Sequence, residues 1–252
     1  DHGHITSSPI AKAPIEHLDA FMRALANAID PLAAFTPVLA GSLSEGTKAM
    51  EPNEGDYIKL PKNFPIEMFY MPDSHTLYVD FARLKVKDDH LSKIDEALQH
   101  LVTDKGFLNR DELFMHAYTH ARNVFNNEEF LKAFPMFYRV HCFDVCPDDV
   151  TIRHLDLIYH DENYCWMPMD VDLVPGIDIP LWFPPWCRDH PFPRNILRQH
   201  GCRMIAKWVI EAENDPTLFR ISFEKCEQHL FRTMPAALKN AYMLGKILKT
   251  LC

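Results

Sequence analysis

Residues 41–60 read GSLSEGTKAMEPNEGDYIKL, and this stretch determines how the rest of the chain is interpreted. Gly41 and Ser42 follow a predicted helix and an extended segment, and a polar loop then leads to Glu54 and Asp56 at the start of a predicted strand. Residues two apart on a strand share one face, so both carboxylates point the same way, about 7 Å apart along the chain. A Gly-Ser turn beside them offers backbone N–H groups and a hydroxyl to phosphate oxygens. Taken alone each signal is weak, because acidic residues before a strand are ordinarily solvated.

The segment MDVDLV at residues 169–174 supplies the next carboxylates. It alternates strictly, so Asp170 and Asp172 share one strand face and the apolar residues between them share the other. Two carboxylates on one strand and a third from a neighbouring strand form a site for two Mg²⁺ ions in phosphoryl transfer. By alternation either aspartate can be the third ligand. The alternative to a metal site is an exposed edge strand.

Hydrophobic periodicity predicts a mixed α/β fold. Apolar residues at steps of three and four predict a helix over about residues 14–33, and Gly201 ends a short helix at 193–200. Further helices are expected at 91–101, 111–134, 222–232, where Ser222 caps the start, and from 235 to 252. Strands are expected at 57–60, 76–85, 137–143, 151–159, 166–174 and 202–209.

Composition narrows the function classes. The 252 residues suffice for one large globular domain or two small ones. A net charge of −9, from 26 basic and 35 acidic residues, argues against a protein whose main task is to hold a nucleic-acid backbone. Seven cysteines without paired spacing argue against a disulfide framework and favour a reducing compartment, the cytoplasm. No stretch approaches 18 uninterrupted apolar residues, so no membrane partner is expected.

The two ends of the sequence lead to a further expectation. The first residues, DHGHITSSPI, lack a starting Met and the features of a signal peptide. The last predicted helix keeps its apolar period to Cys252 without a cap, although an apolar helix face needs a partner layer. We therefore expect this chain to be a piece of a longer protein that continues into a further lobe.

Four motifs in this order and spacing resemble one family. They are G-S-x-x-E-G-T-K at 41–48, P-N-E-x-D at 52–56, V-D-L-V-P at 171–175 and F-R-I-S-F-x-x-x-E at 219–227. Together they resemble the cyclic GMP–AMP synthase-like receptors, metazoan nucleotidyltransferases with the male-abnormal type domain, over about residues 14–252. The resemblance implies a bilobal nucleotidyltransferase fold, with a twisted mixed sheet, a long spine helix and a helical C-lobe. Residues 1–252 would then form one nucleotidyltransferase domain, comprising the N-lobe and the start of a truncated C-lobe.

The resemblance also assigns roles to residues. Its catalytic triad, which binds Mg²⁺ or Mn²⁺, falls on Glu54, Asp56 and Asp172, so the resemblance selects Asp172 over Asp170. Its donor-triphosphate loop falls on Gly41 and Ser42. The positions that contact base and ribose fall on Arg220 and Ser222, with Glu227 nearby, and its phosphate-binding lysine falls on Lys246.

Two positions depart from the family pattern. Gly55 stands where a bulky apolar residue is usual, which would loosen the strand that carries the first two carboxylates. Glu224 replaces a small hydroxyl residue, and a carboxylate there would change the preferred base.

The activity implied by the resemblance is synthesis of a cyclic dinucleotide second messenger from ATP and GTP in cytoplasmic innate immune signalling. Two alternatives are a non-catalytic nucleotide-binding scaffold of the same family and a template-independent nucleotide polymerase. In the family an activating ligand would be double-stranded RNA or DNA. The predicted helix at 14–33 contains Arg23 as its one basic residue against Glu16, Asp19 and Asp30, so a basic surface for such a ligand is weak here.

Overall fold

The structure is a computed structural model that describes residues 9–29, 35–41, 44, 54–61, 68–71, 81–86, 88–92, 94–142, 154–179, 194–206 and 215–251. In chain order its elements are α1 (Pro9–Ala28), β1 (Phe35–Ala40), β2 (Glu54–Pro61), β3 (Met68–Met71), β4 (Phe81–Val86), α3 (Asp88–Leu91), the 3-10 helix η2 (Glu96–Leu101), α4 (Arg110–Phe125), α5 (Glu128–Lys132), β5 (Phe137–Cys142), β6 (His154–Tyr159), β7 (Met167–Ile179), α6 (Arg194–His200), β8 (Cys202–Ile205), β9 (Leu218–Ser222), α7 (Glu224–Thr233) and α8 (Ala236–Leu251). The predicted mixed α/β class is confirmed.

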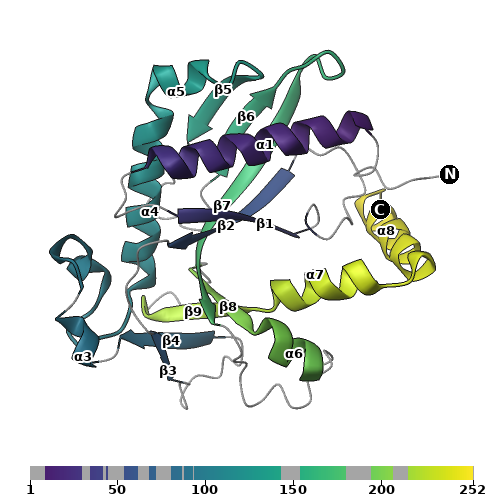
Figure 1. Ribbon diagram of the computed structural model, residues 1–252. Helices are drawn as coiled ribbons and strands as arrows, with labels where there is room; N and C mark the ends of the chain where they lie inside the picture. The colour runs from purple at the N-terminus through teal and green to yellow at the C-terminus, as the bar shows by residue number, and fades with distance from the viewer. Residues whose placement is uncertain are drawn as a thin grey trace.

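Strand β7 connects the whole mixed sheet. Residues 170–175 pair in parallel with β2, residues 167–172 pair antiparallel with β6, and residues 176–179 pair antiparallel with β8. The sheet continues from β2 to β1, from β6 to β5, and from β8 through β9 and β4 to β3. In Figure 1, β7 runs between an upper group of strands and a lower group. One strand therefore belongs to both halves of the sheet.

Helix α1 covers one face of the upper strands (Figure 1). Its side chains at Leu18, Phe21, Met22 and Leu25 are fully buried against the sheet. The Phe21 ring lies 5.0 Å, centroid to centroid, from the ring of Phe137 on β5. Strands β6 and β7 meet the helix with every second residue, as alternation requires. Their other residues therefore point to the opposite sheet face.

A second apolar cluster lies in the lower half. Strands β4, β8 and β9 pack there with η2 and the start of α4. Helix α4 contributes residues to both clusters, so it joins the two halves beside the sheet.

Several element boundaries differ from the sequence prediction. Helix α1 occupies Pro9–Ala28, so it begins before the predicted start at 14, and residues 30–33 of the predicted range lie outside the described residues. The helix includes Pro14, which removes one intrahelical hydrogen bond. The predicted helix at 91–101 is interrupted, and the Asp95 side chain caps η2 by accepting from the N–H of Ala97 at 3.0 Å. The predicted helix at 111–134 divides into α4 and α5, because Asn127 caps a new start. The start of α7 is also shifted, since its N-cap residue is Phe223 instead of Ser222.

Strand β7 extends to Ile179, past the predicted end at Val174. A Cβ at Gly176 would lie 2.6 Å from Cγ2 of Ile58 on β2, so this part of the strand passes too close to its neighbour for a side chain. The short helix α6 ends as predicted at Gly201, whose φ is 64°.

Gly55 has a packing role. It is buried, and a Cβ at this position would lie 3.0 Å from Cδ2 of Leu18 on α1. The absence of a side chain at Gly55 therefore lets α1 approach β2 closely, and Leu18 fills the space that a larger side chain at position 55 would take.

Replacing Gly55 by valine is expected to lower the free energy of unfolding by about 1–3 kcal/mol, because the added methyl groups overpack a site that Leu18 already fills. Combining Gly55→Val with Leu18→Ala should cost less than the sum of the two single changes, because the space left by Leu18 admits the valine. Urea unfolding followed by circular dichroism measures the three variants. Strictly additive losses would show that Leu18 does not limit the space at position 55.

Candidate functional site

The pairing of β2 with β7 brings two of the predicted carboxylates together. In the parallel register Asp56 lies opposite Asp172, and Glu54 lies opposite Asp170. Neighbouring strands are about 4.8 Å apart, and residues in register share a sheet face. Asp56 and Asp172 are both half-buried, whereas Asp170 is exposed. The two half-buried aspartates are thus neighbours on the sheet face opposite α1.

An aspartate that the sequence analysis did not identify extends this acidic face. In the antiparallel register Asp156 of β6 lies opposite Asp170, and His154 lies opposite Asp172. Asp156 is half-buried and flanked by the core residues Leu155 and Leu157. The alternation of HLDLIY at 154–159 carries the same signal as MDVDLV and would have identified Asp156. Asp56, Asp156 and Asp172 thus lie on three adjacent strands and on the same sheet face.

Gly41 lies directly against the Asp56 carboxylate. Ala40, the last residue of β1, pairs with Asp56, and Gly41 then turns the chain with a φ of 62°, in the left-handed region that favours glycine. A Cβ on Gly41 would lie 1.9 Å from Oδ2 of Asp56. The hydroxyl of Ser44 donates to the carbonyl of Gly41 at 2.9 Å and closes the turn. Only glycine therefore fits between this turn and the carboxylate.

Two predicted site groups lie outside the described residues. The structure does not describe Ser42, and it describes the backbone of Glu54 without its side chain. The three-carboxylate arrangement therefore remains a prediction at Glu54, while Gly41, Asp56 and Asp172 are brought together.

The predicted base-binding residues lie in the lower half of the sheet. Arg220 and Ser222 are two apart on β9 and share its less buried face, with Arg220 exposed. The hydroxyl of Ser222 accepts from the backbone N–H of Glu224 at 3.3 Å. Glu227 is exposed on the first turn of α7. Lys246 is separate from this group, on α8, where its Nζ lies 5.7 Å from the centroid of the Tyr242 ring.

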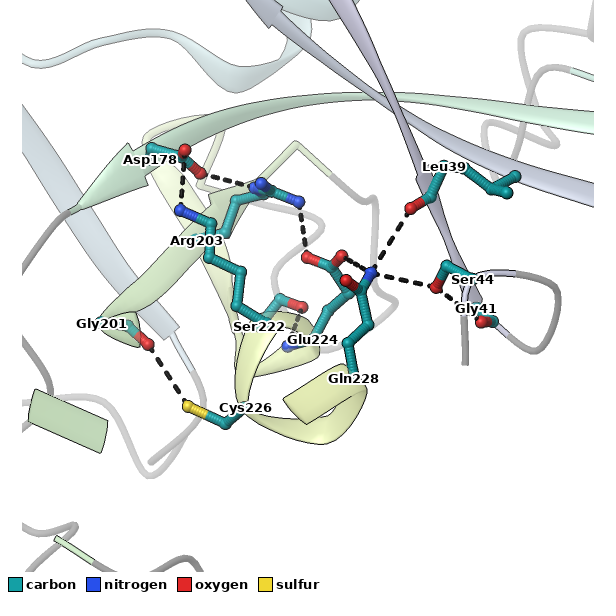
Figure 2. Close-up of polar contacts among 11 residues, drawn as sticks. Leu39, Gly41, Ser44, Asp178, Gly201, Arg203, Ser222, Glu224, Cys226 and Gln228 are labelled. Atoms are coloured by element: carbon teal, nitrogen blue, oxygen red, sulfur yellow. Dashed lines mark hydrogen bonds and ion pairs between the residues drawn. The ribbon is translucent and has the colours of Figure 1, made fainter. Parts of the chain in front are cut away.

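Glu224 is buried and used in internal contacts. One of its carboxylate oxygens accepts from the guanidinium of Arg203, and the other accepts from the side-chain amide of Gln228 (Figure 2). Burial raises the pKa of Glu224, although the positive charges of Arg203 and Lys225 oppose this change. The carboxylate therefore connects Arg203 of β8 to Gln228 of α7, while the change of base preference expected from the sequence stays a prediction.

A hard divalent cation fits the chemistry of the Asp56–Asp172 pair. Mg²⁺ and Mn²⁺ prefer carboxylate oxygens, and Asp56 and Asp172 present carboxylates side by side on one sheet face. Within the described ranges, no group of three or more His, Cys, Asp or Glu residues is arranged to hold a metal ion. Glu54 is the predicted third ligand, and its side chain lies outside those ranges.

No protein-family model matches the sequence, and no curated protein is significantly similar to it. None of the described helices is both long and apolar enough to span a bilayer. Function must accordingly be inferred from the arrangement of the residues themselves.

The close approach of Gly41 to Asp56 predicts opposite effects for alanine at two glycine positions. Gly41→Ala should lower the free energy of unfolding by about 1–2 kcal/mol, because alanine disfavours the left-handed region and its methyl group would displace the Asp56 carboxylate. Gly245 lies within helix α8. Apart from the backbone of its own helix, a Cβ at this position would have no atom of the described residues within 4 Å. Gly245→Ala should therefore raise stability by about 0.5–1 kcal/mol. Urea unfolding compares the two, and a neutral Gly41→Ala would contradict the described turn.

Proposed function

We propose that this protein is a metal-dependent nucleotidyltransferase that makes a cyclic dinucleotide second messenger from ATP and GTP, in the cytoplasm and in innate immune signalling. The observation that carries the proposal is the pairing of Asp56 with Asp172 beside the Gly41 turn. Four motifs that resemble the cyclic GMP–AMP synthase-like receptors support it, and a bilobal fold of that family is part of the proposal. The mixed sheet with a long helix on one face is compatible with such an N-lobe.

In this proposal the chain supplies the metal ligands and the positions of the reactants. Glu54, Asp56 and Asp172 would hold two Mg²⁺ or Mn²⁺ ions. Bound there, the ions would supply the Lewis-acid chemistry that activates the attacking ribose hydroxyl and neutralises charge on the leaving pyrophosphate. The turn at Gly41 and Ser42 offers backbone N–H groups and a hydroxyl to the donor triphosphate.

The acceptor side of the proposed site uses the lower strands and the last helices. Arg220 and Ser222 orient base and ribose, with Glu227 beside them on α7. Lys246 contributes a positive charge for phosphate oxygens. Holding the two nucleotides in line removes much of the entropic cost of their reaction.

The proposed activating ligand, double-stranded RNA or DNA, receives little support from α1. Arg23 forms an ion pair with Asp19 at 2.7 Å, and Lys12 forms one with Glu16 at 3.1 Å. Both basic side chains of these pairs are therefore balanced by acidic neighbours one turn away. A test of activity must include protein without nucleic acid as well as protein with each duplex.

The proposal is tested by incubating the protein with ATP, GTP and Mg²⁺ or Mn²⁺, alone and with double-stranded RNA or DNA. A phosphatase-resistant cyclic dinucleotide, identified by mass spectrometry, is expected. Calorimetric nucleotide binding without product under every condition would instead support the scaffold alternative. Extension of an RNA primer would support the polymerase alternative.

The third carboxylate is tested by comparing Asp172→Asn with Asp170→Asn. Loss of a ligand beside Asp56 should reduce synthesis by about 10²–10³-fold, whereas the exposed Asp170 should be replaceable with most activity retained. The rise in melting temperature on adding Mn²⁺ gives a readout that is independent of turnover, and it should shrink in Asp172→Asn alone. Equal losses in both variants, or a loss confined to Asp170→Asn, would show that the third ligand is assigned to the wrong residue.

A further inference from the structure

A chain of polar contacts crosses the molecule from the lower strands to the Gly41 turn (Figure 2). It begins at Arg203 of β8, which is 2% exposed. Its Nε donates to Oδ1 of Asp178 on β7 at 2.7 Å, and its Nη1 donates to Glu224 at the start of α7. Lys225 binds the second oxygen of Asp178 at 2.8 Å. Two acids and two bases thus balance their charges around the buried Arg203 and Glu224.

The next contact joins Glu224 to Gln228, one turn later on α7. The side-chain Nε2 of Gln228 donates to Oε1 of Glu224 and to the hydroxyl of Ser44, the latter at 3.0 Å. Its two hydrogens serve three acceptors, so the longer contact of 3.4 Å to the carbonyl of Leu39 on β1 shares one of them. Because a carboxylate and a carbonyl only accept hydrogen bonds, they fix the orientation of the amide, with its nitrogen toward the turn.

Ser44 completes the link. Its hydroxyl accepts from Gln228 and uses its own hydrogen for the carbonyl of Gly41 at 2.9 Å. The donors and acceptors are therefore consistent along the whole chain of contacts. Ser44 and Gln228 are 184 residues apart in sequence, so this contact joins the predicted donor-phosphate loop to the helix that carries Glu227.

We propose that Glu224 and Gln228 are positioning residues that hold Ser44, and through it Gly41, in place beside Asp56, so that α7 sets the affinity for the donor triphosphate at the predicted Gly-Ser loop. The proposal rests on the proposed function for its effect on substrate. It explains why a carboxylate occupies position 224. Both oxygens of Glu224 are engaged, one toward the buried Arg203 and one toward Gln228. Any shift of α7 against β8 therefore moves the turn.

The test compares Gln228→Leu with a matched control, Gln199→Leu. Leucine keeps the approximate size of the side chain and removes its donors, and Gln199 is an exposed residue of another helix, α6. With product formation as the readout, Gln228→Leu should raise KM for the donor nucleotide about threefold to tenfold with kcat nearly unchanged, as expected when ground-state binding is lost. Gln199→Leu should leave both constants at the values of the unmodified protein.

Hydrogen–deuterium exchange gives a readout that needs no activity. Peptides covering Leu39 to Ser44 should exchange faster in Gln228→Leu than in the unmodified protein or in Gln199→Leu. Ser44→Ala removes the same link together with the Ser44–Gly41 hydrogen bond, so exchange should be at least as fast as in Gln228→Leu, and adding Gln228→Leu to Ser44→Ala should change nothing further.

Unchanged exchange in Gln228→Leu, or additive effects of the two changes, would overturn the proposal. Faster exchange with an unchanged KM would overturn the role in substrate binding. If the unmodified protein binds no nucleotide, the proposed function fails, while the exchange rates still decide whether Gln228 holds the turn.

Discussion

The parallel pairing of β2 with β7 is the constraint on which the rest of the structure depends. It requires a long connection in the chain, and it places Asp56 beside Asp172 although many other elements separate the two residues in sequence. The opposite face of the same strands is buried against α1, so a slip of one residue would bury the carboxylates and expose the core. Burial of the apolar face and presentation of the acidic face therefore depend on the same register.

Sequence periodicity was sufficient to predict the fold class and most strands. The alternation in MDVDLV and the stripe from Leu18 to Leu25 both have direct counterparts in β7 and α1. Boundaries were less predictable, because capping by Asn127 and by Asp95 depends on single side-chain contacts. The extension of β7 depends on its packing at Gly176, which periodicity does not report.

The candidate site was predictable only in part. Alternation left Asp170 and Asp172 equivalent, and their different exposure arises from neighbouring strands that are distant in sequence. The alternation of apolar and polar residues in HLDLIY at 154–159 would have indicated Asp156. The role of Glu224 had no such signal, because its partners Arg203 and Gln228 meet it only through the packing of α7 on β8. These features of the site depend on contacts between segments that are distant in sequence, and patterns within a single sequence do not report such contacts.

The membership of β7 in both halves of the sheet has a consequence for how this protein can change over evolution. Asp172 pairs in the upper half and Asp178 in the lower half, on one uninterrupted strand. Inserting or deleting one residue between them would rotate one half by a full face relative to the other, since side chains alternate with a period of two. A substitution on β7 changes one side chain and keeps the facing of all the others, whereas a change in length by one residue reverses the facing of every residue beyond it unless a bulge absorbs it.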